Sequence, residues 1–310
     1  MARKRPKGVL ALGWACITCA ATGRTEHVPT SEDYPDHVVK RISFDAGGGY
    51  GWKISALVTP RETPAPWKVV VITGSPSWAE YWAPVLAALP QDREMIVVDR
   101  PGFAASEPVD PVGDIKVQAR ALAPVLRAAP GQKVLLVGQS YGAAIATLMA
   151  REHPRQVDGL VLLSSFLGEP GPTAKFLLEH ANKVLNLLPR DLRHAAIECS
   201  NQGPQLTAFR AALPHLRIPI HVVHGDADDF APIELAEQLA RETPARHPIR
   251  FQRVPGANHF LNDGPAEVLI EAIEAAIPPA KARTWRLPEF PRLRWLKARG
   301  SGALAQPMGA

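Results

Sequence analysis

One short stretch, residues 134–144, constrains the fold of this chain more than any other. Its first half is an apolar, β-branched run typical of a buried strand, and its second half leads into small and apolar residues typical of a helix. Between the two halves lies Gly138-Gln139-Ser140-Tyr141-Gly142. A chain that turns from strand to helix this sharply strains the central residue, and the flanking glycines leave room for the crossing backbone. The stretch therefore predicts a serine hydroxyl lifted clear of a sheet, at the positive end of a helix dipole.

The rest of the body alternates strand and helix patterns. Two strands at 38–44 and 52–59 are predicted to form an antiparallel hairpin, because a glycine-rich turn separates them. Further buried strands are predicted at 68–73, 95–99, 133–138, 160–164, 218–224 and 249–254, with helices at 79–89, 115–128, 143–153 and 233–242. Strands that are apolar throughout and are connected by helices imply an α/β fold with a mostly parallel twisted sheet and helices on both faces.

The interval 166–216 breaks this rhythm. It is long, it contains five prolines, and its stretch 175–188 is prone to form a helix. We interpret the interval as a small helical cap over the ends of the strands, where open α/β sheets bind their ligands. The predicted catalytic domain spans residues 36–280 and includes this insertion.

Two loops supply what a serine nucleophile lacks. A serine hydroxyl has too high a pKa to attack unaided, so it needs a positioned base, and the base needs an orienting group. His259 follows the last predicted strand, and the loop 224–232 after the preceding strand carries aspartates. The chain order Ser, Asp, His is the one expected when the three residues follow successive strands of such a sheet.

These motifs resemble the α/β-hydrolase family over residues 36–280. The resemblance also includes Thr73-Gly74-Ser75-Pro76 after the third strand and Asp99-Arg100-Pro101-Gly102-Phe103 after the fourth. It implies that Ser140 is the nucleophile, Asp228 the acid and His259 the base. It also implies that the backbone N–H groups of Ser75 and Tyr141 form an oxyanion hole, and that Gly138 and Gly142 are the glycines of the nucleophile turn.

The resemblance implies a serine hydrolase that cleaves an ester-like bond (a carboxylic ester, a lipid or a lactone) through an acyl-serine, with no metal and no organic cofactor. Serine at the nucleophile position disfavours dehalogenase and epoxide hydrolase chemistry. Thr73 stands where the family has a histidine, which affects the expected loop conformation and substrate preference. Two alternatives stay open: C–C bond hydrolysis or acyl transfer on the same three residues, and a non-catalytic binding relative.

The first 21 residues have the pattern of a targeting segment. Four basic residues precede an apolar stretch, 8–20, that is too short to span a bilayer, and small residues follow near Ala20. We interpret residues 1–21 as a secretory signal peptide, so that the protein is exported to the periplasm or the medium. The alternatives are a lipoprotein leader acylated at Cys19, which would anchor the protein to a membrane, and an uncleaved tail, which would leave it cytoplasmic.

The net charge of +5 comes from the two ends of the chain. Four Lys and Arg precede residue 8 and a net charge of +6 lies in the tail 281–310, so the body carries about −5. A mildly acidic body argues against a nucleic-acid binder. The tail mixes Trp285, Phe290 and Trp295 with its cations, as a peripheral membrane anchor does, but its prolines favour a solvated extension.

Other candidate residues carry weaker signals. The histidines fit no zinc-site spacing, and His221 and His224 are interpreted as structural residues of a strand. Asp99 and Arg100 are expected to pair with each other and hold their loop. The aromatic residues Trp78, Tyr81 and Trp82 are expected either to line a substrate pocket or to pack a helix.

Overall fold

The computed structural model describes residues 29–244, 249–261 and 266–277. The predicted leader at 1–21 and the predicted basic tail at 281–310 lie outside these ranges. In the described part of the chain, no helix combines the length and the hydropathy needed to cross a membrane.

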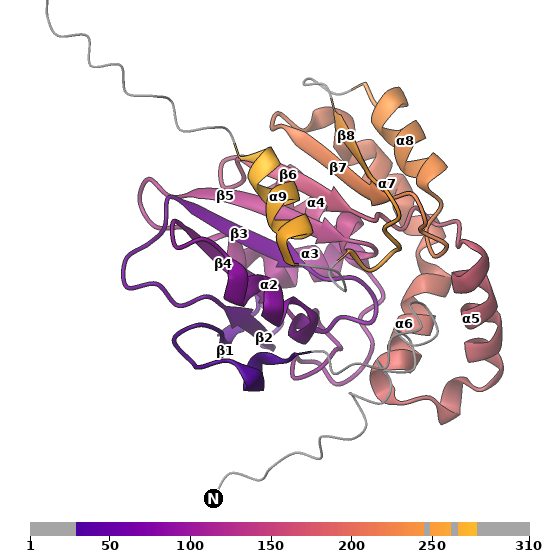
Figure 1. The fold of residues 1–310 in the computed structure, drawn as a ribbon. Helices are drawn as coiled ribbons and strands as arrows, with labels where there is room; N and C mark the ends of the chain where they lie inside the picture. The colour runs from indigo at the N-terminus through magenta and orange to yellow at the C-terminus, as the bar shows by residue number, and fades with distance from the viewer. Residues whose placement is uncertain (1–28, 245–248, 262–265, 278–310) are drawn as a thin grey trace, which may run out of the picture. The chain divides into compact units, whose positions relative to one another are not determined.

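A sheet of eight strands forms the centre of the described chain (Figure 1). Its order is β1-β2-β4-β3-β5-β6-β7-β8. The pairs β1–β2 and β2–β4 are antiparallel, and every later pair is parallel. The strands are β1 (Lys40–Asp45), β2 (Lys53–Val58), β3 (Trp67–Ile72), β4 (Arg93–Val98), β5 (Lys133–Gln139), β6 (Gly159–Leu163), β7 (Ile220–Gly225) and β8 (Arg250–Val254). The prediction of a mostly parallel α/β sheet is confirmed.

Helices cover both faces of the sheet because the side chains of each strand alternate between two apolar cores. On β3, Val69 and Val71 pack with α2 and α9, whereas Val70 and Ile72 pack with α3, α4, α7 and α8. The helices are α2 (Ala83–Ala88), α3 (Ile115–Leu122), α4 (Gly142–Glu152), α5 (Pro172–Lys183), α6 (Arg190–Asn201), α7 (Leu206–Ala212), α8 (Ile233–Glu242) and α9 (Ala266–Ala276), with 3-10 turns η2 (Ala79–Trp82) and η3 (Ala123–Leu126) beside α2 and α3.

Two helices are shorter than their sequence patterns indicate, and a proline explains each difference. The pattern at 79–89 is divided into η2 and α2, and Pro84 occupies the first turn of α2. The pattern at 115–128 is divided into α3 and η3, and Pro124 lies in the first turn of η3. Proline has no backbone N–H and clashes with the preceding turn, so it starts a helix better than it continues one.

Helix α9 has no counterpart among the predicted elements. Its buried residues Leu269, Ala272 and Ile273 recur at helical spacing and pack on the sheet face that α2 also covers. It completes the apolar cover of that face.

The interval predicted as a cap, 166–216, contains α5, α6 and α7. Helix α7 packs Leu206 and Phe209 into the same core as α4, so it belongs to the layer that covers the sheet. Helix α5 buries only Ala174 and exposes Phe176. The part of the insertion that projects from the sheet layers is therefore α5 and α6 (Figure 1).

A buried histidine in β7 makes stability depend on pH. Burial lowers the pKa of His221 to about 4, and the nearby charge of Arg250 adds to this effect. The unfolded chain binds a proton near pH 6.5 and the folded chain only near 4, so this contribution to stability is complete above pH 6.5 and is lost as pH falls towards 4. We expect the free energy of unfolding of the wild type to fall more steeply between about pH 6.5 and 4.5 than that of His221→Phe, in urea titrations. Equal pH dependence of the free energy of unfolding in the two proteins would contradict a lowered pKa of His221.

Candidate active site

Ser140 lies at the sharp turn between β5 and α4. Its φ is +50°, in the left-handed region that non-glycine residues rarely adopt. A side chain at Gly142 would collide with the carbonyl oxygens of Ile72 and Thr73, and one at Gly138 would collide with Ala143. The turn therefore requires glycine at both positions, and its geometry holds the serine at the carboxyl end of the sheet.

Two loops bring an imidazole and a carboxylate to this serine. His259 Nε2 lies 2.9 Å from Ser140 Oγ, and His259 Nδ1 lies 2.8 Å from Asp228 Oδ2. Asp228 follows β7 and His259 follows β8, so the ends of three parallel strands supply the three groups. The serine hydroxyl, the imidazole and the carboxylate thus form one continuous hydrogen-bonded chain.

The carboxylate of Asp228 is buried, and hydrogen-bond donors contact both of its oxygens. Its Oδ1 accepts the backbone N–H groups of Phe230 and Ala231, each at 2.9 Å. Its Oδ2 is shared by His259 and by His224, whose Nε2 lies 2.9 Å away. Burial alone would raise the pKa of Asp228, but the charge of His259 and the hydrogen bonds from both histidines and Ala231 hold it well below its usual range. The carboxylate stays ionised across the physiological range.

Sequence reasoning missed the part that His224 plays. Its pattern indicates a structural residue of a strand, and it is indeed fully buried at the end of β7. Its Nε2, however, faces two acceptors, Asp228 Oδ2 and the carbonyl of Ala231. Because both neighbours are acceptors, this nitrogen carries the hydrogen and donates to the carboxylate. The only signal in the sequence is the four-residue spacing between the two side chains.

The loop after β3 passes directly over Ser140. A Cβ added to Gly74 would lie 3.1 Å from Ser140 Cβ, so the backbone of this loop and the serine are in contact. Ser75 follows Gly74 in this loop, and Tyr141 follows Ser140 directly. Within the described residues, neither of their backbone N–H groups donates to a backbone acceptor.

Thr73 holds this loop in place of the family's histidine. Its hydroxyl donates to the carbonyl of Val98 at 3.0 Å and also contacts the hydroxyl of Ser77. Ser77 in turn accepts the backbone N–H of Arg100 at 2.7 Å. The loop is therefore anchored to the end of β4 without the histidine.

Asp99 and Arg100 do not pair with each other, contrary to the prediction. Asp99 is fully buried, where it accepts Arg41 Nη1 at 2.7 Å and the N–H of Ala79 at 2.7 Å. Arg100 is equally buried and pairs with Glu198 on cap helix α6 at 2.8 Å. Neighbouring residues on extended backbone point to opposite sides, which gives each charge a partner of its own.

A small cavity of about 30 Å³ opens beside Ser140 and His259. Trp78, Tyr81 and Phe260 line it together with the loop after β3. Of the three aromatic residues left open by the sequence, Trp78 and Tyr81 thus border the pocket, whereas Trp82 is buried in the core. A space of this volume holds a few water molecules.

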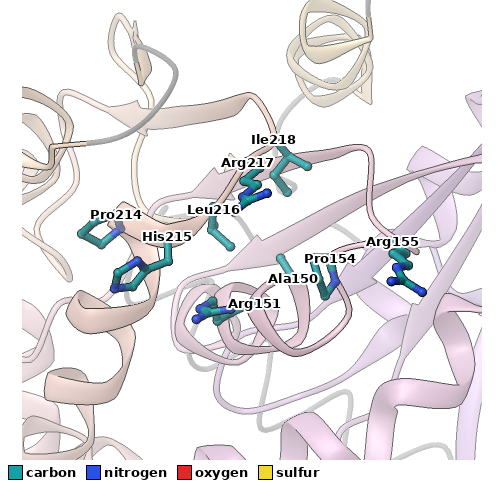
Figure 2. Close-up of a pocket in the computed structure, with 9 residues that line it drawn as sticks. All are labelled: Ala150, Arg151, Pro154, Arg155, Pro214, His215, Leu216, Arg217 and Ile218. Atoms are coloured by element: carbon teal, nitrogen blue, oxygen red, sulfur yellow. The ribbon is translucent and has the colours of Figure 1, made fainter.

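A larger cavity, of about 590 Å³, lies at the opposite end of α4 (Figure 2). It is bordered by the end of α4 and by the segment 214–218, with Arg151, Arg155, His215 and Arg217 among its lining residues. All four of these side chains are exposed, and the described lining includes no serine, cysteine or carboxylate. The described lining therefore lacks the serine–carboxylate combination found beside His259.

The described ranges contain no group of three or more His, Cys, Asp and Glu side chains that could hold a metal ion. Both nitrogens of His259 are engaged, one by Ser140 and the other by Asp228.

Comparison with known proteins agrees with this architecture. The profile of the alpha/beta hydrolase fold matches residues 68–203. A putative carbamate hydrolase, RutD, of Yersinia enterocolitica is 31% identical over 221 residues, which cover 60% of this chain and 80% of that protein. A thermophilic esterase from Thermogutta terrifontis superposes with a TM-score of 0.58 at 21% identity, covering 76% of this chain and 97% of the esterase.

The chain belongs to the α/β-hydrolase family, and the predictions of family and fold class are confirmed. A further match, at 30% identity, is to the polyketide synthase ThaQ of Burkholderia thailandensis; it covers 68% of this chain but only 11% of that much longer protein. The family, together with the putative carbamate hydrolase RutD among its relatives, supports hydrolase as the enzyme class.

Proposed function

We propose that this protein is a serine hydrolase that cleaves a carboxylic ester or a related acyl bond through an acyl intermediate on Ser140. The observation that carries the proposal is the continuous hydrogen-bonded chain from Ser140 through His259 to Asp228. A base within hydrogen-bond reach of a nucleophile, itself oriented by a third group, is the arrangement that activates a serine.

In the proposed reaction, His259 Nε2 takes the proton of Ser140 Oγ as the oxygen attacks the substrate carbonyl carbon. The carbonyl oxygen becomes negatively charged, and the N–H groups of Ser75 and Tyr141 stabilise it. His259 then gives its proton to the leaving alcohol, and the C–O bond breaks. Water, deprotonated by the same imidazole, attacks the acyl-serine and releases the acid.

Asp228 fixes the imidazole for this task. As an ionised acceptor at Nδ1 it keeps the hydrogen of the neutral ring on Nδ1, so that Nε2 presents its lone pair to Ser140. It also stabilises the imidazolium that forms during each half of the reaction. The donor His224 and the two backbone N–H groups hold the carboxylate in one orientation.

The size of the cavity bears on the acyl group. Its small volume, about 30 Å³, favours a short acyl chain over a long one. Acetyl and propionyl esters are therefore the first substrates to test.

A fluorophosphonate probe tests the proposal directly. We expect the wild type to be labelled at Ser140 and Ser140→Ala to remain unlabelled, because only a base-activated serine attacks such a phosphorus centre at a useful rate. Ser164→Ala is a matched control: Ser164 also has a positive φ, follows the neighbouring strand β6 and is buried, but no side-chain partner is found for its hydroxyl among the described residues. Labelling that persists in Ser140→Ala, or that is lost in Ser164→Ala, would refute the assignment.

A further inference from the structure

A buried carboxylate on cap helix α6 plays no part in the reaction just described. Glu198 is 1% exposed, although it lies on the insertion that projects from the sheet layers. Its Oε1 accepts Arg100 Nη1 and Gln118 Nε2, each at 2.8 Å. Its Oε2 accepts Arg100 Nη2 at 2.8 Å and the hydroxyl of Ser75 at 2.7 Å. All of these donors belong to the body of the protein, so this side chain ties the cap to the body.

The same arginine holds the loop that carries the proposed oxyanion donor. Arg100 Nε donates to the carbonyl of Thr73 at 2.9 Å, and Arg100 Nη2 donates to the carbonyl of Gly74 at 2.8 Å. The carbonyl of Gly74 belongs to the same peptide group as the N–H of Ser75, and the carbonyl of Thr73 belongs to the group before it. The guanidinium also lies over the ring of Tyr141, at 4.8 Å from its centroid. Arg100 therefore binds the carbonyl that shares a peptide group with the N–H of Ser75, and it contacts the side chain of Tyr141, the residue of the other proposed oxyanion donor.

Stability alone is a poor explanation for such a pair. Removing two charges from water costs about as much as their attraction returns, so a buried ion pair stabilises a fold little compared with apolar residues of similar volume. What the pair does supply is fixed geometry, because a two-pronged arginine–carboxylate contact tolerates little displacement. Here that geometry is transmitted to the consecutive residues 73–75, through two carbonyls and one hydroxyl.

We propose that Glu198 is a positioning residue that couples the seating of cap helix α6 to the geometry of the oxyanion hole. The inference rests on the proposed function. When α6 is seated, Glu198 anchors the hydroxyl of Ser75 and balances the charge of Arg100, which fixes the carbonyls of Thr73 and Gly74. When α6 moves away, the loop loses the bond from Ser75 to Glu198 and Arg100 loses its counter-charge, so that the N–H of Ser75 is no longer held where the negative charge develops. The oxyanion hole is thus complete only under a closed cap.

The test uses two variants that weaken the same link from opposite ends, Ser75→Ala and Glu198→Gln. Ser75→Ala keeps the backbone N–H and removes only the hydroxyl that reaches Glu198. Removal of a whole oxyanion donor costs about 10²- to 10³-fold in turnover, so we expect misplacement of one donor to lower kcat about 10- to 100-fold. KM for a short acyl ester should change by less than about threefold, because the ground-state carbonyl depends little on this hole.

Two further measurements separate positioning from general damage. A boronic acid inhibitor, which forms a tetrahedral adduct on the serine, should lose affinity in parallel with kcat/KM. In the double variant the loss should not exceed that of the worse single variant, because both changes break one link. Asp191→Asn is the matched control, since Asp191 is a buried carboxylate of the same helix but bonds Trp78 and the N–H of Ala104. It should alter KM more than kcat.

The outcomes separate this inference from the proposed function. Normal kcat and inhibitor affinity in Ser75→Ala would overturn the positioning role even if Glu198→Gln failed to fold. In that case fluorophosphonate labelling of the wild type would still support the serine hydrolase. Absence of labelling in the wild type would instead refute the proposed function itself.

Discussion

Ser140→Ala is expected to lower the turnover of p-nitrophenyl acetate by about 10⁴-fold or more. The variant loses the atom that forms the acyl bond, whereas the cavity and both proposed oxyanion donors remain. The residual rate therefore reflects only binding and charge stabilisation. Steady-state kinetics on protein prepared free of wild-type contamination measures the change.

The substitution should leave the fold intact. Alanine fits the space of the serine side chain. The positive φ of residue 140 strains serine and alanine alike, so the substitution adds no backbone strain. An unchanged midpoint of thermal unfolding would attribute the loss to chemistry. If a folded Ser140→Ala retained turnover within about tenfold of the wild type, an acyl intermediate on this serine would be ruled out.

The inner strands of the sheet could be predicted from the sequence because they are buried on both faces. Such strands are continuous apolar runs, and each predicted run overlaps a strand of the structure. The turn at Ser140 could be predicted for a local reason as well. Gly138 and Gly142 are required by backbone contacts within a few residues of the turn and in the adjacent strand β3.

The anchoring of the site could not be predicted in the same way. Glu198 lies 98 residues from Arg100 and 123 residues from Ser75 in the chain. In the sequence it is one charged residue on a helix with many polar positions, which is typical of a solvent-exposed face. Its burial results from the packing of α6 against the body, a property of the tertiary structure alone.

The same distinction applies to Asp228 and His224. Their spacing and the strand before them indicate that both lie at the carboxyl edge of the sheet. Spacing does not indicate whether two side chains meet, because that depends on the path of the loop between them. In the structure the loop folds back so that the N–H groups of Phe230 and Ala231 bind Oδ1 of Asp228 and turn Oδ2 towards both histidines.

Three aspartates in this loop, Asp226, Asp228 and Asp229, offer a comparison within one chain. Asp226 accepts the N–H of Gly256 at 2.6 Å, and Asp229 accepts the hydroxyl of Thr173 at the start of α5. Both carboxylates therefore fix loops, and Asp228 alone among the three contacts His259. Because the three are close in sequence and identical in chemistry, substituting each by asparagine isolates the effect of position.

Asp228→Asn is expected to reduce turnover by about 10⁴-fold, whereas Asp226→Asn and Asp229→Asn should each cost less than about tenfold. If the amide oxygen of the new side chain keeps the N–H groups of Phe230 and Ala231, its NH₂ group replaces Oδ2 and donates to His259 Nδ1. The ring hydrogen then moves to Nε2, which can no longer accept the proton of Ser140. Turnover of p-nitrophenyl acetate near neutral pH by the three variants, each with a cooperative unfolding transition, measures the difference. Near-normal turnover in Asp228→Asn, with a crippling loss in either neighbour, would transfer the role to that neighbour.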